Sequence, residues 1–382
     1  MYKPGLKLGI LGGGQLGRML IQAAADLDIE THVLDPDDDA PCKNFSTSFT
    51  KGSLTDYDSV YNFGKNMDVL TIEIENVNTD ALFNLQEKGI HVFPQPHVVA
   101  TIQDKRTQKK FFTENNIPSA DFVLTDNIED VKKNIEFLPA FHKLGKSGYD
   151  GKGVIRLKDE TDLHKAFDAP ALLEKYIDVE KEISVIVARS MQGKVVAYPP
   201  VELVFHPEYN LVDYLLAPAQ IENTIAQQAT EIAVRTIREL NMVGILAVEM
   251  FLTKKGEILV NELAPRPHNS GHHTIEANVT SQFQQHLRAI LGLPLGVAST
   301  TFNAAMINLL GAPNEFGPVC YEGLENILQM EGVYLHLYGK KITKPFRKMG
   351  HITIVGNNFS LLHYKISEVK KKLKVISSGQ NS

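Results

Sequence analysis

The feature that most constrains the fold is a glycine-rich loop near the start of the chain. An apolar run at residues 7–11 leads directly into Gly-Gly-Gly-Gln-Leu-Gly at 12–17, and a helical pattern follows. A strand, bare glycines and a helix are typical of the first unit of a parallel α/β sheet, because glycines let N–H groups at the helix N-terminus approach an anion. The next strands, at 31–34, at 68–74 and up to residue 94, alternate with helices, which predicts βαβ crossovers.

The glycine loop does not by itself identify the ligand that it binds. Gly12, Gly14 and Gly17 have the spacing of a dinucleotide fingerprint, and Asp35 at the end of the second predicted strand could bind a ribose. The physics requires only a phosphate at the helix N-terminus, so a ligand with a single phosphate fits as well. A third interpretation is that the glycines only allow close packing of strand and helix.

Composition excludes several classes of protein. The 382 residues carry a net charge of −6, which argues against a nucleic-acid partner. The uncharged stretch 289–314 is interrupted by glycine and proline, so we expect no membrane span. Cys42 and Cys320 lie far apart, and Lys3 and Lys7 lead straight into the glycine loop. We therefore expect no disulfide scaffold, no signal peptide and a cytoplasmic location.

The remainder of the chain divides into two further parts. A basic helix is predicted at 98–115, and a second glycine-rich loop at 145–153 lies between two strands, as in a flexible flap. After residue 175 the strands alternate as in an antiparallel sheet, with a long helix at 222–240. We predict three domains, at 1–100, 101–174 and 175–382.

Two glutamates in apolar strands are the strongest functional signal. Glu249 and Glu262 lie on either side of a turn at 254–257, and a symmetric turn places them directly opposite each other. Like charges at such a position are destabilising, so the pair is protonated, bridged by a cation or simply exposed to water. Carboxylates on a rigid sheet suit Mg²⁺, which fills its other positions with water and ATP phosphates.

The residues after Glu262 suit phosphate chemistry. Arg266, His268 and Asn269 lie in a loop shaped by proline and glycine, where they place a cation and donors beside a transferred phosphate. Lys143 ends an apolar strand, which predicts an anionic partner. Lys105 lies on the basic helix, where a solvated face is an equal alternative.

Four segments carry a resemblance to a known family. They are Gly-Gly-Gly-Gln-Leu-Gly-Arg-Met-Leu at 12–20, Glu-Ile-Glu-Asn-Val at 73–77, Gly-Tyr-Asp-Gly-Lys-Gly at 148–153 and Asn-Glu-Leu-Ala-Pro-Arg-Pro-His-Asn-Ser-Gly-His at 261–272. Together they resemble the N5-carboxyaminoimidazole ribonucleotide synthase family of the ATP-grasp superfamily, and the likeness runs from about residue 8 to residue 351.

The resemblance implies a fold and a reaction. The fold is α/β and α+β: an ATP-grasp fold with a Rossmann-like N-terminal domain, a small flap domain and a mixed or antiparallel C-terminal domain. The reaction converts ATP, bicarbonate and 5-aminoimidazole ribonucleotide into N5-carboxyaminoimidazole ribonucleotide, ADP and phosphate through carboxyphosphate, in de novo purine biosynthesis. The resemblance also implies Mg²⁺, neither biotin nor NAD, and a homodimer.

It further assigns residues to roles. The ATP site comprises Lys105, Lys143, Glu174 and Glu182, and the metal site comprises Glu249 and Glu262. The ribonucleotide site comprises Gln15, Leu16, Glu73, Tyr149, Asp150, Lys152, Arg266, Lys340 and Arg347. The catalytic residues are Arg266, His268, Asn269 and Asp150. The sequence departs from the family in having Lys rather than Arg at position 152, and in a longer, more basic tract at 340–348.

Other functions explain less of the chain. Formate-dependent glycinamide ribonucleotide transformylase is the nearest alternative, because it shares the architecture and the metal pair. A Rossmann dehydrogenase explains residues 12–35 but leaves the two glutamates without a role. A nucleotide-binding regulator would need the two glutamates only for binding. A biotin carboxylase is not favoured, because the sequence shows neither a carboxyl-carrier domain nor the context of a biotinyl-lysine.

Overall fold

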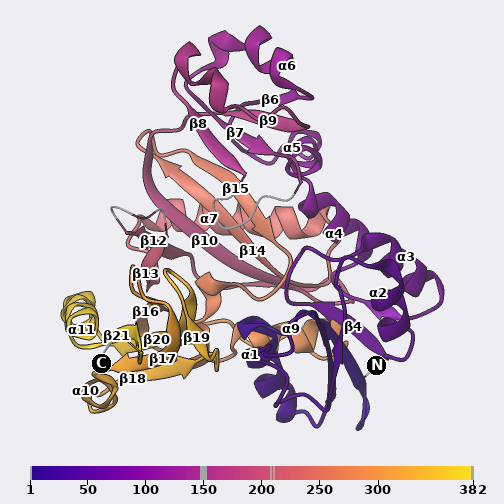
Figure 1. Ribbon diagram of the computed structural model, residues 1–382, viewed down its shortest axis with the longest axis vertical. Coiled ribbons are helices and arrows are strands. Elements are labelled where there is room, and N and C mark those ends of the chain that lie inside the picture. Colours follow the sequence, from indigo (N-terminus) through magenta and orange to yellow (C-terminus); the bar gives the residue numbers. More distant parts are fainter. Residues whose placement is uncertain (1, 147–152, 207–208, 210, 380–382) are drawn as a thin grey trace.

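The computed structural model describes residues 2–146, 153–206, 209 and 211–379. Within these residues the strands form four sheets, of five, four, nine and three strands. Figure 1 shows the four-stranded sheet at the top, the five-stranded sheet of the N-terminal region on the right, and the C-terminal elements at the lower left.

The N-terminal sheet is parallel, as the alternation of strands and helices predicts. Its order is β3-β2-β1-β4-β5. The strands are β1 (Lys7–Leu11), β2 (Glu30–Asp35), β3 (Ser48–Lys51), β4 (Val69–Ile72) and β5 (His91–Val92), and the helices are α1 (Gln15–Ala25), α2 (Tyr57–Gly64) and α3 (Thr79–Glu87). Asp35 is the last residue of β2, and Glu73 directly follows β4. Because these strands are parallel, both carboxylates lie at the carboxyl end of the sheet.

The prediction of one helix over 98–115 is wrong. The structure has two helices, α4 (Pro96–Gln103) and α5 (Lys105–Glu114), separated by Asp104 in an extended conformation. The Asp104 carboxylate accepts a hydrogen bond from the Arg106 N–H, and the Lys105 N–H donates to the Gly145 carbonyl at 2.8 Å. An N-cap aspartate starts a new helix here, and the first N–H group of that helix is tied to Gly145, just after β7.

The flap domain is a small antiparallel sheet. Its strand order is β6-β9-β7-β8, and the purple ribbon at the top of Figure 1 shows it standing above the central sheet. Its elements are β6 (Phe122–Thr125), α6 (Ile128–Lys133), η1 (Ile135–Phe137), β7 (Ala140–Leu144), β8 (Val154–Leu157), η2 (Glu160–Lys165) and β9 (Ala171–Lys175). Most of the loop 145–153 between β7 and β8 lies outside the described residues.

The largest sheet is antiparallel throughout, which confirms the pattern expected after residue 175. Its path is β15-β14-β10-β12-β13-β16-β20-β18, with β11 paired to β10. The strands are β10 (Val179–Arg189), β11 (Val195–Ala197), β12 (Val201–Phe205), β13 (Val212–Ala217), β14 (Gly244–Thr253), β15 (Ile258–Ala264), β16 (Asn303–Leu310), β18 (Val333–Leu337) and β20 (Lys348–Gly356).

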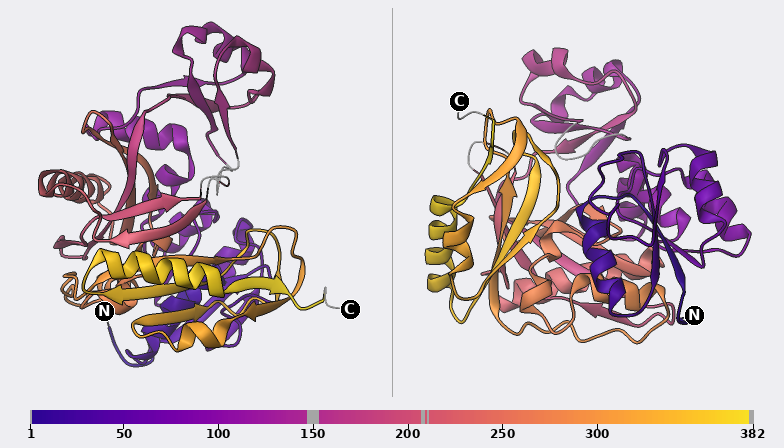
Figure 2. Two further views of the ribbon diagram at one scale, coloured as in Figure 1. Left: turned by 90° about the vertical axis from the view of Figure 1, so that its left-hand side faces the viewer. Right: turned by 60° about the horizontal axis from the view of Figure 1, so that its bottom comes forward.

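Helices cover this sheet on both sides. The apolar side of α7 (Asn223–Glu239) packs on β10 and β14, whereas α9 (Gln282–Ile290) lies between β14 and α1. Figure 2 shows α11 (Phe359–Lys372) on the side of the C-terminal strands that faces away from the N-terminal domain. The other C-terminal elements are η3 (Asn269–Gly271), α8 (Thr274–Ala277), β17 (Gly317–Glu322), α10 (Leu324–Leu328), β19 (Ile342–Thr343) and β21 (Lys374–Ser377).

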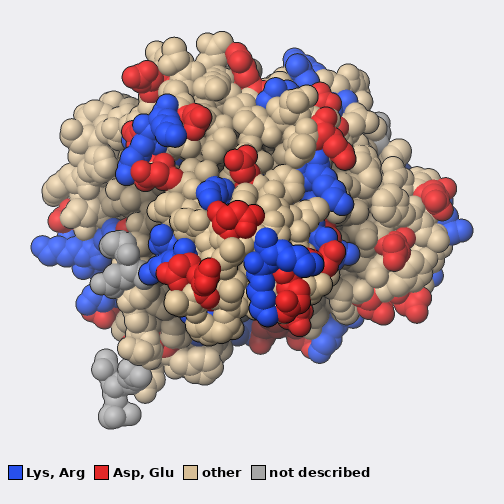
Figure 3. Space-filling view, turned by 90° about the horizontal axis from the view of Figure 1, so that it is seen from above, with Lys and Arg blue, Asp and Glu red and all other residues tan. Residues whose placement is uncertain are grey.

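Two surface properties follow from the described residues. None of their helices combines the length and the apolar character needed to cross a membrane. Lysine and arginine are interspersed with aspartate and glutamate over the face shown in Figure 3.

Candidate active site

Ion pairs between distant segments bring the predicted site together. Lys105 Nζ on α5 lies 2.9 Å from Glu262 Oε1 on β15, which joins the first helix of the predicted second domain to the Glu249–Glu262 pair. Arg266, just after β15, lies 2.8 Å from Glu75 of the N-terminal domain. These contacts span more than 150 residues, and they place the end of β15 where the three predicted domains meet.

Glu249 and Glu262 are paired across the β14–β15 hairpin, as predicted, but not for the predicted reason. The turn is a three-residue loop with Gly256 at φ +80°, and Thr253 N–H donates to the Glu257 carbonyl. From that turn Met250 pairs with Val260, a register in which the two glutamates would not be opposite. A β-bulge at residue 261 shifts the register by one and restores the pair.

The environment of Glu249 suits a cation. Burial, with the negative charges of Glu262 and Glu182, raises the pKa of Glu249 to about 8, although Lys348 and Arg266 oppose the shift. Among the described residues no group of three or more His, Cys, Asp or Glu side chains could hold a metal ion. Mg²⁺ is commonly held by one or two carboxylates plus substrate phosphates. The two glutamates therefore fit Mg²⁺ that arrives with a nucleotide, rather than a metal held by protein alone.

Three charged groups form a buried cluster beside this pair. Glu174 at the end of β9 accepts a hydrogen bond from Lys143 Nζ at 2.5 Å through Oε1, and its Oε2 lies 2.7 Å from Lys109 Nζ in an ion pair. Lys143 also donates to the Asn261 side chain at 3.3 Å. The prediction of an anionic partner for Lys143 is thus confirmed. Burial raises the pKa of Glu174, but the two ammonium groups outweigh it and the net shift is downward.

Lys109 was missed by the sequence reasoning, although a signal existed. It lies four residues after Lys105, so the two side chains share one face of α5. That face turns toward Glu262 at one end and Glu174 at the other. Glu182 on β10 completes this end of the site, and burial raises its pKa to about 7 against the attraction of Lys143.

His268 is held by a chain of buried hydroxyl groups. Its Nδ1 accepts the Ser270 N–H at 3.3 Å and lies 2.9 Å from the Ser270 hydroxyl, which contacts the Ser184 hydroxyl at 2.8 Å. Nε2 lies 3.6 Å from Glu249 Oε1. Burial and the nearby charges of Arg266 and Lys348 hold the pKa of His268 well below its ordinary value. A neutral ring whose Nδ1 is an acceptor carries its proton on Nε2, toward Glu249.

The neighbouring loop residues are also fixed. The amide of Asn269 exchanges hydrogen bonds with that of Asn308 on β16, at 2.8 and 3.2 Å. The buried Gln282 holds the loop through the N–H and the carbonyl of His268. Glu75, the partner of Arg266, is a second residue that sequence reasoning left without a role, although it lies in the segment 73–77.

Two carboxylates of the same chain accept hydrogen bonds from the glycine loop. Asp35 accepts from the Gly13 N–H at 2.6 Å, and Glu73 accepts from the Gly17 N–H at 2.5 Å. A Cβ at Gly14 would lie 2.1 Å from Glu73 Oε1, so glycine is needed there for this contact. Asp35, which could bind a ribose in the dinucleotide interpretation, caps the glycine loop in this structure.

Two first-turn N–H groups of α1 remain suited to a ligand. Gln15 and Leu16 are the first two residues of α1, which has a glycine N-cap without a side-chain cap. Such positions have no carbonyl partner within the helix. Burial raises the pKa of Glu73, which accepts the Gly17 N–H of the same helix, to about 7.

The basic tract approaches the same loop. Lys340 donates to the Lys348 carbonyl at 2.8 Å, and its pKa is lowered to about 8 by burial and by Arg347, with Glu73 opposing. Arg347 donates to the Ile342 carbonyl at 2.7 Å. Lys348 lies within electrostatic reach of Glu249 and His268, a placement that the sequence did not reveal.

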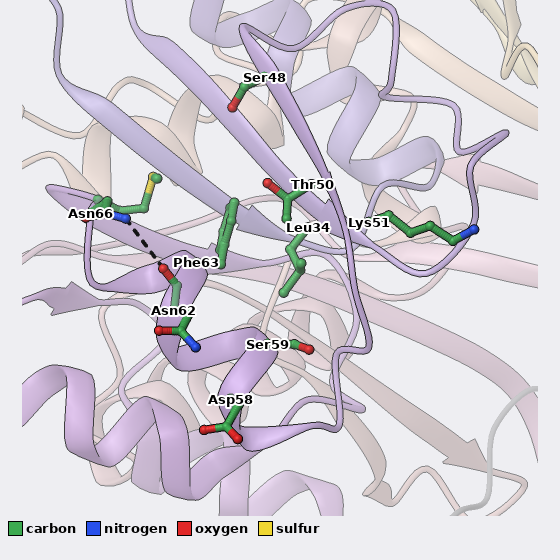
Figure 4. Close-up of a pocket in the computed structure, with 10 residues that line it drawn as sticks. Leu34, Ser48, Thr50, Lys51, Asp58, Ser59, Asn62, Phe63 and Asn66 are labelled. Carbon is green, nitrogen blue, oxygen red and sulfur yellow. Dashed lines mark hydrogen bonds between the residues drawn. The ribbon is translucent and has the colours of Figure 1, made fainter.

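Two further observations bound the site. Tyr149, Asp150 and Lys152 lie outside the described residues, so their predicted roles have no structural account. A separate hollow of about 410 Å³ lies between the edge strand β3 and α2 (Figure 4), and none of the predicted site residues lines it.

Three successive parts of the chain match known family domains. Residues 6–103 match the ribonucleotide synthetase preATP-grasp domain, and residues 110–283 match the ATP-grasp domain. Residues 304–363 match the phosphoribosylaminoimidazole carboxylase C-terminal domain.

Named relatives give the same result. The chain is 37% identical to the N5-carboxyaminoimidazole ribonucleotide synthase of Bacillus subtilis (strain 168), over 92% of each protein. It is 40% identical, over 92% of its own length, to the bifunctional purine synthesis protein purC/E of Dictyostelium discoideum. The chain spans only 37% of that longer relative.

Solved structures resemble the whole chain. The N5-carboxyaminoimidazole ribonucleotide synthetase of Thermotoga maritima is 42% identical with a TM-score of 0.90, and the match covers 98% of this chain and all of the other. The Aspergillus clavatus enzyme, solved with ADP and 5-aminoimidazole ribonucleotide, is 32% identical with a TM-score of 0.86, and the match covers 96% and 98% of the two chains.

Proposed function

The chain belongs to the N5-carboxyaminoimidazole ribonucleotide synthase family of ATP-grasp ligases, and we propose that its described residues form separate sites for ATP and for the ribonucleotide. The family places the enzyme in purine biosynthesis, and the relatives do not favour the glycinamide ribonucleotide transformylase alternative. The observation that carries the proposal is the Glu249–Glu262 pair, with Lys105 and His268 in contact with its two members.

At the ATP end, lysines neutralise phosphate charge. Lys143 and Lys105 meet the phosphates, and Glu182 binds the ribose hydroxyls. Glu174 belongs to the predicted ATP site, and both of its oxygens are engaged by Lys109 and Lys143 here. Mg²⁺ held by Glu249 and Glu262 would supply charge neutralisation at the phosphoryl group.

The reaction needs two displacements. A bicarbonate oxygen attacks the γ-phosphorus of ATP, the bond to the β-phosphate oxygen breaks, and carboxyphosphate and ADP form. The amine of 5-aminoimidazole ribonucleotide then attacks the carboxyl carbon, phosphate leaves and the nitrogen loses a proton. Arg266, oriented by Glu75, holds the anionic carboxyphosphate.

His268 acts in this scheme as a donor rather than as a base. Its pKa is well below the ordinary value, so it holds an added proton weakly, and its own proton lies on Nε2. Nε2–H donates to a carboxyphosphate oxygen near Glu249. Asn269, tied to Asn308, shapes the loop. Of the predicted catalytic residues, Asp150 is then the one that accepts the proton from the amine.

The ribonucleotide binds at the other end of the site. Its phosphate meets the N–H groups of Gln15 and Leu16 together with Lys340 and Arg347. Glu73 binds a ribose hydroxyl, and Tyr149 and Lys152 complete the predicted contacts. The support is that α1 begins with bare glycines and that Lys340 lies within electrostatic reach of Glu73.

Three further properties belong to this proposal. The enzyme is a homodimer, and it uses neither biotin nor NAD. It works in the cytoplasm, where Cys42 and Cys320 remain free thiols. The domain boundaries at residues 100 and 174 remain predictions.

A substrate panel tests the function. Purified enzyme with Mg²⁺ and ATP is assayed for ADP release with 5-aminoimidazole ribonucleotide, and separately with formate plus glycinamide ribonucleotide. We expect a sharp rise only with the first, and incorporation of labelled bicarbonate into its product. Turnover with formate and glycinamide ribonucleotide instead would overturn the reaction but leave the ATP-grasp assignment intact.

A further inference from the structure

Lys109 is a buried cation that the reaction scheme does not use. Its residue surface is only 4% exposed, and its ammonium group lies 2.7 Å from Glu174 Oε2. It also donates to the Ala120 carbonyl at 3.3 Å and lies 5.8 Å from the ring centroids of Phe112 and Phe122. A lysine enclosed on every side in this way cannot reach a nucleotide itself, so any effect on ATP passes through Glu174.

Lys143, the other partner of Glu174, is placed differently. Its side chain is 14% exposed, and besides Glu174 it contacts Asn261, the residue before Glu262. Its ammonium group is thus at the boundary between the buried cluster and the metal pair. A lysine at this position can exchange part of its contact with Glu174 for contact with a phosphate.

The two lysines share a single carboxylate, and this leaves one positive charge in excess. If Lys109 were absent, Glu174 would be balanced by Lys143 alone, and both of its oxygens would compete for that one ammonium group. The excess charge would disappear, and Lys143 would be drawn away from the metal pair. Asp121 lies within electrostatic reach of Lys109, and Glu182 lies within electrostatic reach of Lys143.

We propose that Lys109 is a positioning residue for ATP: by occupying one oxygen of Glu174, it keeps Lys143 available to the nucleotide phosphates. The inference rests on the proposed role of Lys143 at the phosphates. It assigns to α5 a double function, because Lys105 and Lys109 on one helix face set the charge at both ends of the phosphate site.

A purely structural role makes a different prediction. If Lys109 only offsets the buried charge of Glu174, its loss lowers stability without acting specifically on nucleotide affinity. The two roles are separated by removing the carboxylate as well. In K109M/E174Q the cluster carries one positive charge, on Lys143, and Lys109 has no carboxylate to act through. If Lys109 acts through Glu174, K109M therefore adds no further loss of nucleotide affinity to that of E174Q.

The experiment measures Mg²⁺·ADP binding by calorimetry and the KM values for ATP and for the ribonucleotide, with melting curves to confirm folding. K109M is expected to bind ADP about tenfold more weakly and to raise the KM for ATP similarly, with the ribonucleotide KM unchanged. K109M/E174Q is expected to bind ADP within about threefold of the single variant E174Q, which is measured beside it because Glu174 belongs to the predicted ATP site. Lys110, the next residue and exposed, provides the matched control K110M, expected to bind as wild type does.

Each outcome has a distinct meaning. ADP affinity unchanged in K109M, or ADP binding by K109M/E174Q about tenfold weaker than by E174Q, overturns the inference. If K109M does not fold, the substitution is made in the E174Q background, where it should change ADP affinity less than about threefold. A tenfold loss there would equally overturn it. K143M with full ADP affinity would overturn the proposed ATP site itself, whereas K143M weakened with K109M unaffected removes only the role of Lys109.

Discussion

Glu249→Gln is expected to change how the stability of the ligand-free enzyme depends on pH. Burial, with Glu262 and Glu182, raises the pKa of Glu249 from 4.5 to about 8 in the folded protein. Between these values the folded state holds a proton that the unfolded chain has released, so the free energy of unfolding falls as the pH rises. Glutamine has no such proton, so the variant does not lose this part of its stability.

The size of the effect follows from the shift. One pKa unit corresponds to about 1.4 kcal/mol, so the full change is roughly 5 kcal/mol. The Glu249 side chain is 26% exposed, and solvent screening reduces this to about 2 kcal/mol at pH 8. For a protein of this length such a difference moves the melting temperature by about 3 °C.

Melting curves at pH 5, 6.5 and 8 without divalent cations provide the assay. Wild type and Glu249→Gln should melt together at pH 5, and the variant should melt about 3 °C higher at pH 8. Mg²⁺ with ADP should stabilise wild type more than the variant, because the carboxylate is the proposed ligand. Glu257→Gln, at an exposed position in the adjacent turn, is the control. An identical pH dependence in wild type and Glu249→Gln would refute the reasoning.

Three other substitutions test the remaining parts of the site. Glu262→Gln should lower ADP release at least about a hundredfold while the protein stays folded, because one carboxylate remains and the like-charge repulsion falls; normal turnover at saturating Mg²⁺ would remove the pair from the mechanism. Glu75→Gln should lower kcat about tenfold with the KM for ATP unchanged, because Arg266 loses its charged partner at 2.8 Å; an unchanged kcat would show that Arg266 does not need this partner. Arg347→Ala should raise the KM for the ribonucleotide about tenfold and leave ADP affinity intact, as binding titrations would show; a weaker affinity for ADP would place Arg347 at the ATP site instead.

The sequence predicted the features that depend on local patterns. The parallel order of the first sheet follows from strands alternating with helices. The antiparallel sheet follows from alternation over residues 183–188 and from two apolar strands joined by the turn at 254–257. Periodicity and turn residues act over a few positions, so they can be read without tertiary contacts. The likeness at residues 261–272 likewise identified the family before any geometry was known.

Some correct predictions depended on geometry that the sequence did not contain. Glu249 and Glu262 are opposite each other because a bulge at residue 261 offsets the register of a three-residue loop, whereas a symmetric turn was expected. The shorter loop shifts the register by one residue, and the bulge shifts it back. This compensation is visible only in the pairing of the two strands. The helix break at Asp104 was missed because the N-cap gains support from a contact between Lys105 and Gly145, forty residues away.

The tertiary structure alone decided which charged groups act on one another. Glu73 meets Gly17 across 56 residues, Glu174 meets Lys109 across 65, and Lys105 meets Glu262 across 157. Sequence spacing indicates that Lys105 and Lys109 share a helix face, but not what that face meets. A carboxylate or an ammonium group acquires its pKa and its partner from burial and from the packing of one domain on another, and these exist only in the folded chain.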